Sequence, residues 1–271
     1  MTLLPVCREG ECLSTEASEH ADRSSRPPKV TSSGLQVIEM ARDILRREED
    51  TKASLHGDQI AGTLMLGSVR TSALNLLPRA LVQMRHRYPD LKPNLRVSLS
   101  SPLIADVAAG RLDAAIVAEH LGFPDALRWR PFLREPLWLI APHGMEASDP
   151  IELLNTRSYI RFRSAVPLAN LIDTELSRLG VVTNDVAEID TIGSIVTGVR
   201  QGLGISVVPH VALQEPEDIG LTRLPFGHPQ VVRQIGIIER TDAPRAEIIS
   251  RLHAVLADLC GDYGVDRPAR S

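Results

Sequence analysis

The stretch GTLMLGSVRTSALNLLPRALVQMRHRY, residues 62–88, decides the fold because it places a strand, a polar turn and a helix in direct succession. Residues 63–66 are mostly apolar, which is typical of a short parallel strand covered on both faces. Apolar side chains then recur at helical spacing, and Pro78 fits in the first turn of that helix. The apolar positions expected on the buried face are Leu74, Leu77, Leu81, Met84 and Tyr88.

The polar turn of this unit carries Arg70, Thr71 and Ser72 at the expected start of the helix. Hydroxyl groups and free backbone N–H groups meet there, and such helix N-termini hold anions in many proteins. The alternative is that Thr71 or Ser72 serves only as the N-cap of the helix. The two roles are compatible, so the turn is a candidate binding element.

The later chain repeats this order of strand and helix, which predicts an α/β fold built as two similar lobes. Residues 108–117 and 200–208 both show a helix end, a glycine and then a buried strand. Residues 131–136 contain two prolines and are expected to form a loop. Further strands are expected at 94–100, 112–117, 137–141, 159–162, 187–190, 205–208 and 234–238, and further helices at 103–108, 168–179, 192–199 and 246–259.

Composition indicates an ordinary soluble globular protein. The 271 residues are 43% hydrophobic and 24% charged, and the formal net charge of −4 gives no overall basic footprint for nucleic acid. No apolar run approaches the roughly 18 residues of a spanning helix, and residues 1–30 lack a secretory apolar region. Cys7, Cys12 and Cys260 are an odd count without metal-site spacing. These features exclude membrane insertion and export and favour a cytoplasmic location.

The N-terminal part divides into two segments. Residues 1–30 show no helical or strand period and are expected to be disordered or a remnant. Thr31 or Ser32 can then cap a helix whose apolar stripe includes Leu35, Ile38 and Leu45. Because such a helix needs a packing partner to be stable in water, residues 31–56 are predicted to be a linker and dimerisation helix.

No enzyme motif, metal cluster or cofactor fingerprint is found, so no catalytic residue, metal or cofactor is predicted. Small polar groups instead follow the expected strands, where open α/β sheets place their ligands. Two arginines flank a strand end in the second lobe and could clamp a carboxylate, or alternatively form surface ion pairs. The predicted ligand-binding residues are Thr71, Ser72, Ser100, Ser101, Arg161, Arg163 and Thr191.

Several short motifs, in this order and spacing, give the chain a family resemblance. They are GTLMLG at 62–67, LLP at 76–78, RYP at 87–89, GRLDAAI at 110–116, and GLGI at 202–205 followed by VP at 208–209. In these motifs the chain resembles the LysR-type transcriptional regulators from about Arg26 to the final helix. The resemblance implies a two-lobed effector-binding domain of the periplasmic-binding-protein type 2 fold, preceded by a long linker helix.

The resemblance also implies how the chain is divided and used. Residues 57–271 would form the effector-binding domain, with lobe 1 at about 57–136 plus 240–265 and lobe 2 at about 137–239. The Thr71 and Ser100 turns resemble the family's first-lobe effector contacts, and the Arg161 region resembles a second-lobe contact. The implied partners are a small-molecule effector and further copies of the chain, as a homodimer or homotetramer.

Upstream, residues 26–34 resemble the junction between the family's DNA-binding wing and its linker helix, but the preceding residues show no periodicity of a helix-turn-helix. We therefore expect DNA binding only if a helix-turn-helix is present in the full-length gene product. A truncated gene, a misassigned start codon or a frameshift would each explain the departure.

The leading hypothesis is a transcriptional regulator that senses a small anionic metabolite and has no membrane partner. A two-lobed solute-binding protein without a DNA role is the alternative. An enzyme on this fold comes third, since carboxylates such as Asp113 lie near strand ends but lack a nucleophile and base around them. For Asp113 we expect local pairing rather than acid–base work.

Overall fold

The computed structural model describes residues 21–22, 29–55, 61–119, 122–145, 149–213 and 218–262, in two compact units, Met1–Thr63 and Leu64–Ser271. In the first unit, β1 (Ala21–Asp22) pairs antiparallel with β2 (Lys29–Val30), and α2 (Ser32–Leu55) follows. The Oγ1 of Thr31 accepts a hydrogen bond from the N–H of Gly34 at 3.1 Å, so Thr31 caps the helix as the sequence predicts. The rest of the segment expected to be disordered, 1–20 and 23–28, lies outside the described residues.

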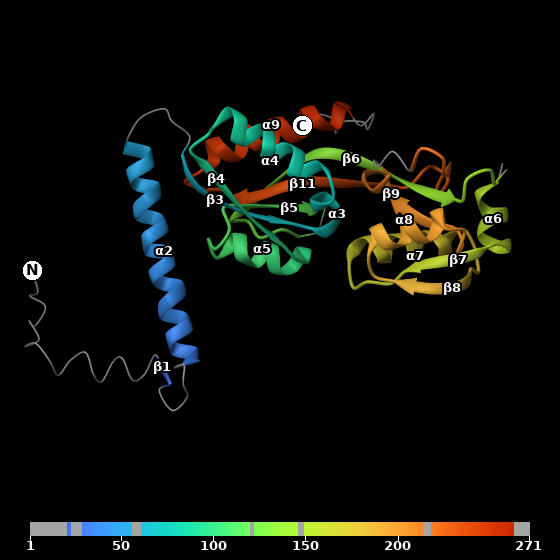
Figure 1. Ribbon diagram of the computed structural model, residues 1–271, viewed down its shortest axis with the longest axis horizontal. Coiled ribbons are helices and arrows are strands. Elements are labelled where there is room, and N and C mark those ends of the chain that lie inside the picture. Colours follow the sequence, from blue (N-terminus) through green and yellow to red (C-terminus); the bar gives the residue numbers. More distant parts are fainter. Residues whose placement is uncertain are drawn as a thin grey trace, which may run out of the picture. The chain divides into compact units, whose positions relative to one another are not determined.

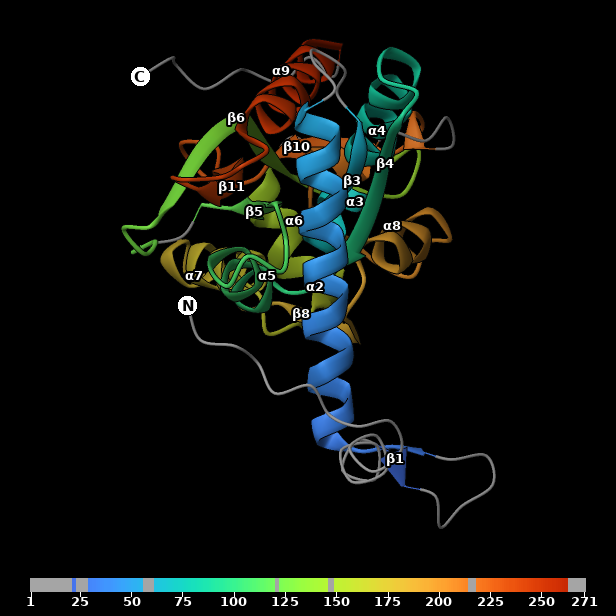
Figure 2. The ribbon, with the colours of Figure 1, turned by 90° about the vertical axis from the view of Figure 1, so that its left-hand side faces the viewer.

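The second unit contains two lobes (Figure 1), and lobe 1 is a sheet covered by helices on both faces. Lobe 1 comprises β3 (Gly62–Ser68), α3 (Arg70–Ala73), α4 (Leu76–Arg87), β4 (Leu91–Val97), α5 (Ser100–Ala108), β5 (Ala114–Ala118), the first part of β6 (Leu127–Ala141), β11 (Val232–Arg240) and α9 (Ala246–Asp262). The strand order is β6-β11-β5-β3-β4, with α5 on one face of the sheet and α4 and α9 on the other (Figure 2).

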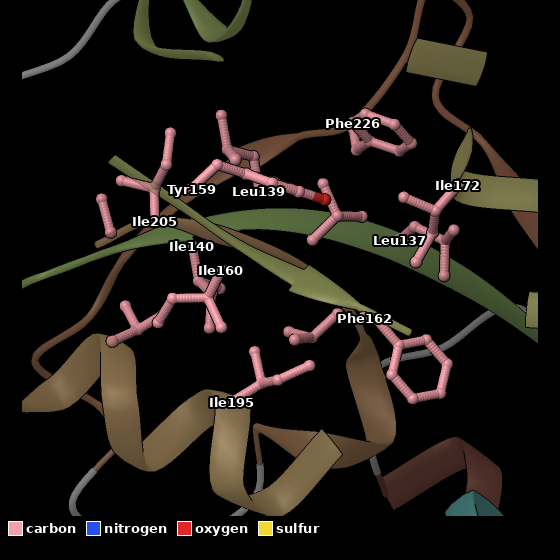
Figure 3. Packing of buried hydrophobic residues seen from close by; sticks show 14 of the residues in the cluster. Leu137, Leu139, Ile140, Tyr159, Ile160, Phe162, Ile172, Ile195, Ile205 and Phe226 are labelled. Carbon is pink, nitrogen blue, oxygen red and sulfur yellow. The ribbon is translucent and has the colours of Figure 1, made fainter. Parts of the chain in front are cut away.

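Lobe 2 is also built of strands covered by helices. It comprises α6 (Pro150–Thr156), β7 (Ser158–Phe162), α7 (Pro167–Arg178), β8 (Asn184–Ile189), α8 (Ile192–Arg200), β9 (Ser206–Pro209), η1 (His210–Ala212) and β10 (Thr222–Pro225). Strands β7 and β8 are parallel, and β9 and β10 pair antiparallel with the second half of β6. The core of lobe 2 brings Ile160 and Ile205 together with Ile195 from a covering helix (Figure 3). The predicted two-lobed α/β fold is confirmed.

The spacing of apolar residues explains why these helices form and which face they bury. In α8 the buried residues Ile192, Ile195, Val196 and Val199 follow the helical repeat. The prediction for the first long helix is correct for the buried positions Leu77 and Met84 but wrong at the helix start, because the chain breaks at Leu74 into two helices, α3 and α4. The buried face of α4 is formed by Leu76, Leu77, Ala80 and Met84. Leu74 is consequently exposed.

The predicted loop at 131–136 is also wrong, since these residues lie inside the 15-residue strand β6. Over this stretch β6 pairs only with β11 and has no other neighbour among the described strands, so it is an edge. Proline is tolerated on an edge strand because its missing N–H can face away from the ladder. A register shift opposite Ile235 and Gly236 accommodates the irregularity.

The chain passes between the lobes within β6 and again at the start of β11, and these two crossings form the hinge. Since β11 pairs with β6 along its whole length and with β5 over Ile235–Glu239, residues 232–239 belong to the sheet of lobe 1, and the crossing points lie near Pro136 and Val232. Facing residues of these two strands, Glu135 and Arg233, form an ion pair at 2.7 Å with side chains only 1% and 9% exposed. The hinge is thus fixed by a buried charge pair.

A close backbone approach in lobe 2 requires glycine at position 204. A Cβ atom there would collide with the carbonyl oxygen of Ser158. That oxygen accepts a hydrogen bond from the N–H of Ile205 at 2.8 Å, which holds β7 next to the chain entering β9. The glycine of the GLGI motif therefore has a structural role.

We predict that Gly204→Ala lowers the free energy of unfolding by about 1–3 kcal/mol, because the added methyl group must push two backbone segments apart. Urea denaturation measures this change. Gly193→Ala is the matched control, since a Cβ atom at position 193 meets nothing within 4 Å and alanine favours the helix. Equal stability of the two variants would contradict the prediction.

We also predict that Arg233→Gln costs about 3 kcal/mol of stability, because it leaves the carboxylate of Glu135 buried without its counter-charge. The double variant Glu135→Gln with Arg233→Gln should recover part of this loss, which a double-mutant cycle in urea reveals. As a control, Arg163→Gln breaks the exposed ion pair with Glu188 and should leave the denaturation midpoint unchanged.

Candidate functional site

A cleft of about 350 Å³ lies between lobe 1 and lobe 2. Its walls come from the segments that follow strands β3, β4, β7 and β8, together with the end of β5 and the hinge strand β11. Except for Arg233, which lies at the start of β11, these are the carboxyl ends of strands, where ligands bind in open α/β folds. The polar residues that line the cleft are Arg70, Thr71, Ser98, Ser100, Ser164, Asp190, Thr191 and Arg233.

Three helices of at least nine residues, α5, α7 and α8, begin at this cleft. Their N-cap residues, Leu99, Val166 and Thr191, make no side-chain capping hydrogen bond. By contrast, α6, which begins elsewhere in lobe 2, is capped by the Asp149 carboxylate. The first N–H groups of α5 and α8, and those of α7 after Pro167, which has no N–H, are therefore not satisfied by side-chain caps, and together they favour an anion.

Arg233 places a positive charge in the cleft from the hinge side. Its Nη2 donates to the Oγ1 of Thr71 at 3.1 Å, and its Nε donates to Glu135 at 2.7 Å. The other oxygen of Glu135 accepts from the N–H of Val211 in lobe 2 at 2.8 Å. No described residue accepts a hydrogen bond from Nη1 of Arg233. That N–H group is available to a ligand oxygen.

The structure brings together three of the residues that the sequence predicts for ligand binding. Thr71, Ser100 and Thr191 all line the cleft, from both lobes. Ser72 is buried beside Thr71 but is not part of the lining, and Ser101 is exposed on α5 outside it. The hydroxyl of Thr191 donates to Ser194 at 2.8 Å.

The capping alternative for Thr71 and Ser72 is wrong. Both lie within the short helix α3, whose N-cap is Val69 and has no side-chain capping bond. The hydroxyl of Thr71 is instead directed to the guanidinium of Arg233. Thr71 therefore links the turn of lobe 1 to the hinge.

Arg161 and Arg163 lie outside the cleft lining and form ion pairs, which was the alternative considered for them. Arg161 binds Asp173, Asp185 and the hydroxyl of Thr183. Although burial opposes its charge, the hydrogen bond and negative charge of Asp185 raise the pKa of Arg161, and Asp173 adds to this. Arg163 pairs with Glu188 at 2.7 Å. Both guanidinium groups are therefore held in ion pairs with carboxylates of lobe 2.

The neighbouring Tyr159 is also structural. Its ring is fully buried in the lobe 2 core, with the guanidinium carbon of Arg161 5.6 Å from the ring centroid. Burial raises the pKa of the Tyr159 hydroxyl, so the phenol stays neutral. Tyr159 is not part of the cleft lining.

Sequence reasoning missed Arg233 and Glu135. Glu135 was assigned to a loop, and Arg233 lies one residue before the strand that the sequence predicts. The two positions are 98 residues apart, so no local pattern pairs them. Asp113, in contrast, behaves as expected, because its carboxylate accepts the N–H of Met65 at 2.7 Å and ties β5 to β3.

Two further observations concern metal binding and membrane crossing. No group of three or more His, Cys, Asp or Glu side chains among them is placed to hold a metal ion. None of the described helices combines the length and apolar character needed to cross a membrane.

Several known proteins are similar to this chain in sequence. A hydrogen peroxide-inducible genes activator of Haemophilus influenzae is 26% identical over 244 residues, covering 88% of this chain and 81% of that protein. An uncharacterised HTH-type transcriptional regulator of Bacillus subtilis, YusT, is 25% identical over 214 residues, covering 79% of this chain and 71% of that protein.

Among solved structures, a reduced form of OxyR from N. meningitidis superposes with a TM-score of 0.64 and 24% identity, covering 76% of this chain and 99% of that chain. A hydrogen peroxide-bound OxyR mutant of Corynebacterium glutamicum gives a TM-score of 0.66 and 22% identity, covering 90% and 79%. These structural similarities support the fold described above for this chain.

The family model described as the LysR substrate binding domain matches residues 57–261. This match covers most of the chain, including both lobes and the cleft between them. The chain therefore belongs to the LysR family of transcriptional regulators, which are not enzymes, and carries its effector-binding domain.

Proposed function

We propose that this domain senses a small anionic metabolite, which binds in the cleft between the lobes and controls transcription through an oligomer. The observation that carries the proposal is Arg233, whose nine-tenths buried guanidinium lines the cleft and retains an unused N–H group. Glu135 balances the charge of Arg233, so the attraction acts at short range, through the hydrogen bond that the Nη1 N–H can donate to a ligand anion. The uncapped starts of α5, α7 and α8 add partial positive charge in the same space.

Residues 31–56 act in this proposal as the linker and dimerisation helix. Apolar side chains of α2, among them Leu35, Met40 and Ile44, are exposed on the single chain. A second copy of the helix would remove this surface from water, which is the usual source of helix stability. The assembly in this proposal is a homodimer or homotetramer that acts in the cytoplasm. It contacts DNA only if a helix-turn-helix is present in the full-length gene product.

Reversible binding suits the cleft better than thiol chemistry. Relatives of this chain are named for hydrogen peroxide, and peroxide oxidises accessible cysteine thiolates. No cysteine lines the cleft, and Cys260 is buried in α9. Cys7 and Cys12 lie outside the described residues. The proposed signal is therefore occupancy of the cleft by an anion.

We predict that a screen of metabolic anions by thermal shift finds a ligand that stabilises the protein. A ligand at 100 times its Kd should add about 2.7 kcal/mol, because it binds the folded state alone. Thr71→Val should reduce the shift strongly, since it removes the hydroxyl that lines the cleft and orients Arg233.

Ser101→Ala is the matched control, because Ser101 carries the same kind of hydroxyl near a helix start but lies outside the cleft. Its ligand-induced shift should equal that of the unmodified protein. A shift that is unchanged in Thr71→Val, or lost equally in both variants, would argue against this cleft as the site.

A further inference from the structure

Apolar side chains gather on the lobe 1 wall of the cleft although they remain in contact with solvent. Leu74, Val97 and Leu99 are 50%, 46% and 39% exposed, and all three line the cleft. They come from two separate segments, after β3 and at the end of β4. Apolar surface left in water costs roughly 25 cal/mol per Å², so covering this wall with an apolar group would be favourable.

The lobe 2 wall is apolar as well. Phe162, Val166 and Leu168 line it on the side of α7, and Ile192 lines it at the start of α8. A ligand between the lobes would therefore contact hydrocarbon on both sides. Binding pockets for small molecules usually combine such walls with a few placed polar groups.

The charges at the cleft are few. Arg233 and Arg70 supply two positive charges and Asp190 supplies one negative charge, while Glu135, which is not part of the lining, is ion-paired with Arg233. No described residue forms an ion pair with Asp190. Because Asp190 stands immediately before Thr191 at the start of α8, a second anionic group on that side would be repelled. The charge pattern fits one anionic head near Arg233.

The size of the cleft limits the size of the ligand that it can hold. Its volume of about 350 Å³ lies near the lower end of the roughly 300–1,000 Å³ range of ligand pockets. Bulky cofactors and nucleotides are poorly matched to this space.

We infer that the ligand is a small monocarboxylate with an apolar body, an inference that rests on the proposed function of the same cleft. The carboxylate accepts hydrogen bonds from Nη1 of Arg233 and from helix N–H groups. The apolar body lies against Leu74, Val97 and Leu99 on one side and Phe162 on the other. This assignment separates the ligand from sugar phosphates, dicarboxylates and free amino acids.

Isothermal titration of the full chain with defined probes tests the inference. 3-Phenylpropionate should bind, and its uncharged amide should bind at least tenfold more weakly, because hydrogen bonds to a charged partner are the stronger ones. Succinate keeps the charge but lacks the apolar body, and it should bind at least tenfold more weakly than 3-phenylpropionate.

Two variants test the apolar contact and the negative charge of the cleft separately, and neither changes a residue of the hinge. Leu74→Ser should weaken 3-phenylpropionate binding about tenfold by removing apolar contact. The matched control is Val82→Ser, since Val82 is 53% exposed on α4 and lies outside the cleft. Asp190→Asn should leave the affinity for 3-phenylpropionate unchanged or increase it, because it removes a repulsive charge.

The outcomes separate this inference from the proposed function. Thr71-dependent binding of succinate or glucose 6-phosphate, with none of 3-phenylpropionate, would overturn the inference while supporting an anion-sensing cleft. Binding of phenylalanine that is lost in Asp190→Asn would also overturn it, in favour of a zwitterion. Failure of every anion in the panel and in the wider screen would overturn both.

Discussion

The ion pair between Glu135 and Arg233 is the interaction on which the rest of the site depends. It joins β6, which passes between the lobes, to β11, which begins where the chain re-enters lobe 1. Each partner also makes a second contact, Arg233 with Thr71 in lobe 1 and Glu135 with the N–H of Val211 in lobe 2. Burying two charges is costly, and apolar residues at such positions are often as stable. Here the pair provides something that apolar residues cannot, namely a fixed cation at the floor of the cleft.

Both lobes present the cleft with the same kind of element, a strand followed by a helix whose first N–H groups lack a side-chain cap. The caps that do occur, at Thr31 for α2 and Asp149 for α6, belong to helices that do not begin at the cleft. Missing caps reduce helix stability slightly. Helix α4 also lacks a side-chain cap although its N-cap, Asn75, does not line the cleft, so missing caps are not confined to the cleft helices. At the cleft, however, the uncapped N–H groups are placed where a ligand can accept their hydrogen bonds.

The sequence predicts the fold well because apolar periodicity and glycine positions are local signals, as in α8 and the GLGI motif. It also places Thr71, Ser100 and Thr191 in the cleft, since each follows a strand that can be recognised. It fails where partners are distant. Asp173 and Asp185 occupy Arg161, and Glu135 meets Arg233 across 98 residues, which no spacing within one segment reveals. The prolines of β6 led to the wrong prediction of a loop for a related reason, because only the strand pairing shows that residues 131–136 form an edge of the sheet.

The pairing of β6 with β11 has a consequence for the chain's architecture. Pro136 and Val232, where the chain leaves and re-enters lobe 1, are directly paired residues of neighbouring antiparallel strands, a separation of about 5 Å. A short hairpin turn would span that gap. In its chain topology, lobe 2 is therefore an insertion between β6 and β11, two paired strands of the lobe 1 sheet. A gene could exchange lobe 2 as a cassette and alter half of the binding cleft while the strand order of lobe 1 stays the same.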